Sequence, residues 1–141
     1  MVYYGRLVTP NFKGTEARRR RRVREGNDPL YLDRMRRLPS CVSGKPGAEP
    51  HHLRRKEERG MGQKATDRWA LPLTREEHTF GADCVHSVGA RLEEEWFLAR
   101  GVRCWELAEK LWALHQAGAE DAELRAAIIL HRNGGWDDGG F

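Results

Sequence analysis

The chain has 141 residues, of which 39% are hydrophobic and 33% charged, with a formal net charge of +4 at pH 7. This length suits one domain with a flexible arm and excludes a large multidomain enzyme. The sequence has no apolar run near the roughly 20 residues of a membrane-spanning helix, and residues 1–14 lack a signal-peptide layout, so we expect a cytoplasmic protein with no membrane partner.

Positive charge is concentrated in the first half of the chain. Residues 1–70 hold 18 Lys and Arg against 8 Asp and Glu, whereas residues 71–141 hold 7 against 13. We expect residues 1–27 to form a flexible basic arm, because dense like charges oppose compaction. Clustered arginines bind phosphates and release counterions, so nucleic acid is the expected partner. The expected contacts of the arm are Arg18, Arg19, Arg20, Arg21, Arg22 and Arg24.

The folded domain is predicted over residues 28–132. Asp28 is a suitable N-cap and Pro29 suits the first helical position, which predicts a short helix that ends before Pro39. The following stretch, residues 39–53, is rich in proline and glycine. We interpret it as a two-stranded hairpin.

A polar loop is predicted over residues 54–64, and a short buried extended segment over residues 69–73. Thr74 and Glu77 then have capping-box spacing, in which each side chain caps the other's backbone amide. A short helix is therefore expected to start at Arg75.

Amphipathic periodicity predicts three further helices, at residues 90–100, 103–116 and 120–131. Their tryptophans are expected in the core, and Glu93, Glu94 and Glu95 on a solvated helix face. Residues 133–141, with four glycines, are expected to form a frayed tail.

Histidines are the most informative residues. Four of the six lie within a window of 36 residues: His51, His52, His78 and His86. Neighbouring residues of a strand point to opposite faces, so one imidazole of the 51–52 pair can bind a divalent ion while the other polarises a water. Taken alone, such a pair more often lies on the surface without a ligand. His115 and His131, on later helices, are interpreted as structural.

The order of four short motifs is more specific than the histidine pair. The chain has CVSG at 41–44, HHLR at 51–54, GMGQKATD at 60–67 and PLTREEH at 72–78. This string resembles the phage-encoded HNH-superfamily nucleases of the Ref type and related uncharacterised phage and prophage proteins. The resemblance covers roughly residues 38–112.

The resemblance implies a fold and a set of roles. The fold would be α+β, a small ββα-metal (HNH-like) core followed by two or three amphipathic helices. His52 would be the general base, and Asp67 would orient it or the catalytic loop. His51 and His78 would bind one divalent ion, Mg²⁺ or Mn²⁺, with Zn²⁺ a further candidate. The side chains expected to hold backbone phosphates are Arg54, Arg55 and Lys64.

This chain departs from the family at three positions. Thr74 and Glu77 replace a cysteine and a histidine that the family often has, which argues against a separate structural zinc. His86 follows His78 by eight residues rather than four. A straight helix would separate residues eight apart by ~12 Å. We therefore expect a loop at residues 80–82 that folds His86 back as a third metal ligand.

Three cysteines without a CxxC pair are expected to be reduced thiols rather than a zinc site. The expected function is a metal-dependent DNA endonuclease or nickase of a phage or prophage, acting in the bacterial cytoplasm in recombination or repair. The family also implies a recombinase filament as a partner for cutting. The alternatives are a non-catalytic DNA-binding accessory protein with a degenerate finger, and an assembly factor whose acidic helices bind a protein. The sequence indicates no oligomeric state.

Overall fold

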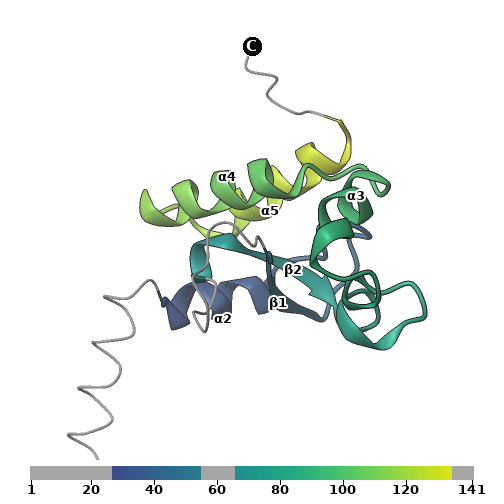
Figure 1. The fold of residues 1–141 in the computed structure, drawn as a ribbon. Helices are drawn as coiled ribbons and strands as arrows, with labels where there is room; N and C mark the ends of the chain where they lie inside the picture. Colours follow the sequence, from purple (N-terminus) through teal and green to yellow (C-terminus); the bar gives the residue numbers. More distant parts are fainter. Residues whose placement is uncertain (1–26, 55–65, 135–141) are drawn as a thin grey trace, which may run out of the picture.

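The computed structural model describes residues 27–54 and 66–134, and within them the chain forms four α-helices and one two-stranded antiparallel sheet (Figure 1). The predicted α+β class is confirmed. Nearly all of the predicted basic arm and polar loop, and the tail from residue 135, lie outside the described residues. In the described part of the chain, no helix is both long and apolar enough to cross a membrane.

Helix α2, Pro29–Arg37, has the predicted bounds. The Asp28 side chain caps it by accepting a hydrogen bond from the Tyr31 amide at 3.1 Å. The helix ends because Leu38, which precedes Pro39, is extended, as the proline ring requires. Tyr31 and Met35 are fully buried.

The sheet pairs β1, Ala48–His52, with β2, Ala70–Thr74, so the predicted hairpin within residues 39–53 is wrong. Ala48 lies opposite Thr74, and His52 lies opposite Ala70. Residues 40–45 instead close on themselves, because the Ser40 amide donates to the Lys45 carbonyl at 2.9 Å. The Ser40 hydroxyl accepts from the Val42 and Ser43 amides, and the Cys41 amide donates to the Pro72 carbonyl of β2 at 3.0 Å, so this loop contacts β2 and forms no hairpin with β1.

A single π-helical turn, Glu76–Phe80, follows β2. The predicted capping box is present: the Glu77 amide donates to Thr74 Oγ1 at 3.3 Å, and the Thr74 amide donates to Glu77 Oε1 at 2.9 Å. Gly81 ends the turn by donating its amide to the Glu76 carbonyl at 2.8 Å. A Cβ at Gly81 would lie 2.8 Å from that same carbonyl oxygen, so the close approach requires glycine.

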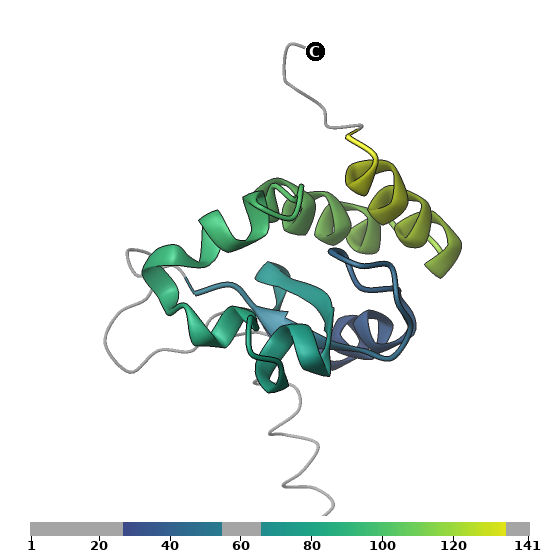
Figure 2. The same cartoon turned by 90° about the vertical axis from the view of Figure 1, so that its right-hand side faces the viewer.

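The C-terminal helices are α3, Glu93–Leu98, α4, Cys104–Gln116, and α5, Asp121–Arg132. In Figures 1 and 2 the sheet lies below α4 and α5, with α2 beside it. The Trp69 and Trp105 rings pack edge to face at 5.1 Å, which fixes the start of β2 against α4. The predicted core role of the tryptophans is confirmed, with Trp96 buried and Trp105 and Trp112 packed on the core.

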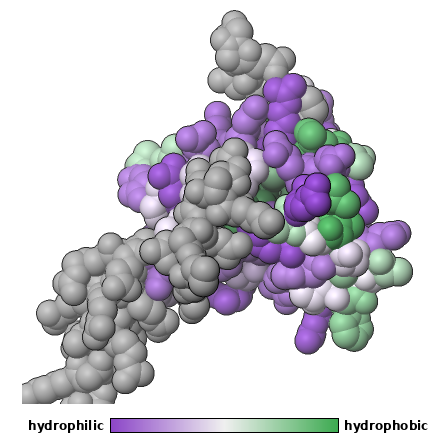
Figure 3. Space-filling model, in the orientation of Figure 1, coloured by the Kyte–Doolittle hydropathy of each residue, from purple (hydrophilic) through white to green (hydrophobic). Residues whose placement is uncertain are grey.

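The predicted helix over residues 90–100 is shorter than expected, because Ala90–Leu92 form a separate 3-10 turn. Leu92, at the end of that turn, is 50% exposed. The face of the molecule shown in Figure 3 is mostly hydrophilic, with hydrophobic side chains in small separate areas.

Candidate metal centre

Three histidines from three separate segments converge at the end of β1. His51 belongs to β1, His78 to the turn Glu76–Phe80, and His86 to the 3-10 turn Val85–Ser87. One ring nitrogen from each lies within 4.8 Å of the others, close enough to hold a metal ion. The sequence-predicted ligands are therefore brought together.

The loop expected to return His86 is present. Gly81 is extended after the turn that carries His78, and its carbonyl accepts the Cys84 amide at 3.3 Å. Val85, fully buried, anchors the next turn in the core and leaves the neighbouring His86 ring exposed. The chain thus reverses between His78 and His86, and their ring centroids lie 4.7 Å apart.

His51 is the buried member of the cluster, with 1% of its surface exposed. Its Nδ1 has no hydrogen-bond partner within the described residues, and its Nε2 faces the Glu93 carboxylate at 3.3 Å. Burial lowers its pKa to about 4, so the ring is neutral at pH 7, as a metal ligand must be. A buried ring nitrogen without a partner is costly, and an ion bound at Nδ1 would satisfy it. The donor set therefore fits a metal.

Two carboxylates flank the cluster. Glu49 Oε1 lies 2.7 Å from His78 Nδ1, a contact that places the proton on Nδ1 and leaves the Nε2 lone pair free. Glu93 Oε1 lies 3.3 Å from His51 Nε2. A carboxylate behind a ligating imidazole fixes the tautomer and raises ligand basicity.

The prediction that Glu93 lies on a solvated face is wrong, because its side chain is 4% exposed. It accepts the Arg54 amide at 2.9 Å and also pairs with the Arg54 guanidinium. Burial alone would raise the pKa of Glu93, but its contacts with His51 and Arg54 hold that pKa below its ordinary value. Glu93 is therefore an ionised support of the cluster.

His52 points to the other face of β1 and forms a second polar pair. Its Nε2 lies 2.7 Å from Asp67 Oδ1, and its side chain is 34% exposed. Asp67 is buried, and its Oδ2 accepts the Asp28 amide at 2.6 Å. The carboxylate is thus fixed while the imidazole edge remains open to solvent.

Polar contacts connect Asp28 to helices α4 and α5. Asp28 Oδ2 lies 2.9 Å from His115 Nε2, and His115 Nδ1 lies 3.0 Å from Arg34 Nη1. Arg34 in turn pairs with Asp121 at 2.9 Å. His115 therefore links α4 to the α2 cap that holds Asp67.

His131, expected to be structural, is buried, and its Nε2 accepts the Arg103 amide at 3.0 Å. The cysteines are free and buried, and none joins a metal-binding group in the described part of the chain. Burial raises the pKa of Cys104 to about 12, so its thiol stays protonated.

The predicted phosphate contacts are mostly not visible. Arg18, Arg19, Arg20, Arg21, Arg22, Arg24, Arg55 and Lys64 lie outside the described residues. Arg54 turns inward, toward Glu93 and the Val85 carbonyl, which its Nη2 reaches at 3.1 Å. Its role in phosphate binding stays a prediction.

Sequence reasoning missed both carboxylates. Glu49 had a usable signal, since a residue two positions before His51 shares its face of the strand. Glu93 had no comparable signal, because it is one of three consecutive glutamates and the burial of Phe97, four residues later, is seen only in the structure.

The fold and the site define an α+β protein with a three-histidine cluster able to hold a metal ion. The chain belongs to the family described as "Protein of unknown function (DUF968)", whose profile matches residues 16–96. That stretch contains both strands, the three histidines of the cluster and the His52–Asp67 pair. No curated protein and no solved structure matches the chain.

Proposed function

We propose that this protein is a metal-dependent DNA endonuclease or nickase of the HNH type. One observation carries the proposal: a strand end presents a three-histidine cluster on one face and the His52–Asp67 pair on the other. A ligand site beside an oriented imidazole is what hydrolysis of a phosphodiester requires.

The order of elements supports a ββα-metal finger, since β1, β2 and the turn that carries His78 follow one another along the chain. The helical part is a single turn rather than a full helix. The capping box at Thr74 holds that turn, and the chain reversal after it supplies His86 in place of a longer helix.

His51, His78 and His86 would hold the ion, which when bound would stabilise the charge on the scissile phosphate and the leaving oxygen. Three imidazoles suit Zn²⁺ and other transition metals, whereas Mg²⁺ prefers oxygen ligands. Of the ions expected from the sequence, Zn²⁺ therefore suits this donor set best.

His52 would act as the general base. Its Nε2 faces Asp67, so the Nε2–H donates a hydrogen bond to the carboxylate and Nδ1 is left to take a proton from water. Asp67 would then stabilise the imidazolium, while the Asp28 amide keeps the carboxylate in place. Asp67 is a positioning residue in this scheme.

DNA is the proposed substrate because the first half of the chain carries the excess of Lys and Arg. The phage or prophage origin, a role in recombination or repair, and a recombinase filament as partner are parts of the proposal that rest on the resemblance.

A nicking assay on supercoiled plasmid and on single-stranded DNA tests the proposal, with Mg²⁺, Mn²⁺, Zn²⁺ and a chelator compared. We expect His52→Ala to lose at least about 100-fold of the cutting rate while it still binds metal. His51→Ala should lose both cutting and metal binding. Thr79→Ala, an exposed change beside the cluster, is the matched control.

DNA binding without cutting under every ion, with and without a recombinase filament, would contradict the proposal. That result would favour the non-catalytic accessory protein. Cutting that survives in His52→Ala would remove His52 from the mechanism.

A further inference from the structure

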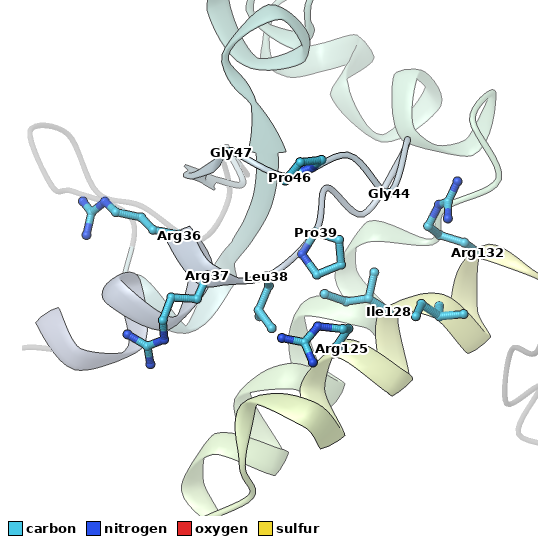
Figure 4. A pocket seen from close by; sticks show the side chains of 11 residues that line it. Arg36, Arg37, Leu38, Pro39, Gly44, Pro46, Gly47, Arg125, Ile128 and Arg132 are labelled. Atoms are coloured by element: carbon cyan, nitrogen blue, oxygen red, sulfur yellow. The ribbon is translucent and has the colours of Figure 1, made fainter.

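A groove of about 580 Å³ lies away from the histidine cluster, between the end of α2, the loop before β1 and one face of α5 (Figure 4). Its volume is in the range of pockets that hold small organic ligands. It shares no residue with the metal cluster or the His52–Asp67 pair. Nothing in the proposed chemistry uses it.

Four arginines line the groove, and two of them have acidic partners. Arg36 pairs with Asp33 at 2.7 Å, and Arg37 pairs with Asp121 at 2.8 Å. Within the described residues, the other two arginines, Arg125 and Arg132, have no such partner. The groove therefore carries uncompensated positive charge.

The Arg132 guanidinium lies against the loop backbone. A Cβ placed on Gly44 would lie 2.8 Å from Arg132 Nη1, and Gly44 has a φ of +78°. Glycine at this position lets the guanidinium reach across from α5 to the loop. Arg125 and Arg132 lie about two helical turns apart on α5, and in Figure 4 their guanidinium groups lie at different ends of the groove.

The groove also has an apolar lining. Leu38 and Ile128 are buried at its base, and the rings of Pro39 and Pro46 lie along the loop side. A guanidinium group without an acidic partner favours a phosphate, which it can bind bidentately. An apolar surface beside them favours a flat ring carried on the same ligand, because covering it removes apolar area from water.

We propose that this groove binds a nucleotide, with its phosphate on Arg125, its base on the proline-lined side and, when it belongs to a DNA strand, the neighbouring phosphate on Arg132. The nucleotide has two possible sources, a free mononucleotide or one unit of a single DNA strand. The second source, a single DNA strand, rests on the proposed function. β1 runs five residues, about 17 Å, from the loop that lines the groove to His52. A single DNA strand bound in the groove would therefore pass near the candidate catalytic site.

Binding is measured on the full chain with EDTA present, so that the histidine cluster does not contribute. The probes are thymidine 5′-monophosphate, followed by NMR, and a fluorescein-labelled ten-nucleotide oligo(dT), followed by anisotropy. The test variant is R125Q/R132Q, and the matched control is R75Q/R91Q, which removes two exposed arginines outside the groove. R125K/R132K keeps both positive charges but removes the planar guanidinium groups that can bind a phosphate through two hydrogen bonds.

We expect R125Q/R132Q to weaken oligo(dT) binding at least about tenfold relative to R75Q/R91Q. The slope of log affinity against log salt should fall by about 1.4 for two lost phosphate contacts. R125K/R132K should retain part of the affinity, which also shows that the fold is intact.

Weaker binding of both probes supports a groove that takes a free nucleotide as well as a strand. Weaker binding of oligo(dT) alone supports the strand as the source. Equal affinity of R125Q/R132Q and R75Q/R91Q for both probes overturns the proposal. Since these measurements need no metal, failure of the nuclease proposal in the nicking assay would be a separate result.

Discussion

The carboxylate of Glu49 gives the most direct test of the metal centre. It lies 2.7 Å from His78 Nδ1 and fixes the tautomer in which Nε2 is free. Loss of such a carboxylate partner lowers metal affinity about 10- to 100-fold, or about 1.4–2.7 kcal/mol. We expect Glu49→Ala to show this loss, and Glu49→Gln, which keeps an acceptor oxygen, to show a smaller one.

The Glu49 side chain is 38% exposed, so its removal should leave the fold intact. Zinc affinity is measured by competition with a chromophoric chelator, and unfolding by urea is followed in parallel. Glu76→Gln removes an exposed charge from the same turn as His78 and serves as the control. Equal zinc affinity for Glu49→Ala and the unchanged chain would refute the assignment of His78 as a ligand held by Glu49.

Three further outcomes are expected. Asp67→Asn should slow single-turnover nicking by about 100-fold or more without changing metal affinity, because the His52 imidazolium loses its carboxylate; an unchanged rate would exclude this role. Phe97→Ala should lower the urea-measured unfolding free energy by about 3–5 kcal/mol, because the ring is fully buried beneath His51; a loss under 1 kcal/mol would contradict the packing. Burial, then Arg103, lowers the pKa of His131 from 6.5 to about 4. The unfolded chain therefore binds this proton first, and stability should fall between pH 6.5 and 4, by at most about 3 kcal/mol. His131→Gln should flatten the dependence of the unfolding free energy on pH in this range. An unchanged slope would show that His131 does not cause it.

Local contacts were predictable from the sequence. The Asp28 cap of α2 and the Thr74–Glu77 capping box depend on side chains within three residues of the amides they bind. The three helical segments after residue 89 were predicted for a similar reason, since their apolar period is visible in a short window. The convergence of His51 and His78 came from motif order rather than from periodicity.

Strand pairing and the buried carboxylates could not be predicted in the same way. The partner of β1 begins 18 residues after it ends, and a nearer proline- and glycine-rich stretch offered a simpler hairpin. Three consecutive glutamates open α3, and only the rotation of that helix against the sheet decides which one is buried. Glu93 faces Arg54 because Trp96 and Phe97 direct the same side of the helix into the core.

Asp28 is also the place where the arginine-rich segment joins the folded body. Its amide donates to Asp67, which holds His52, and Arg24 precedes it by four residues. Four residues of fully extended chain span at most about 14 Å. Covalent length alone therefore limits how far Arg24 can be from Asp28, whose amide holds Asp67. Under the proposed function, this short connection limits which phosphates Arg24 can bind to those within a few nucleotides of the cut.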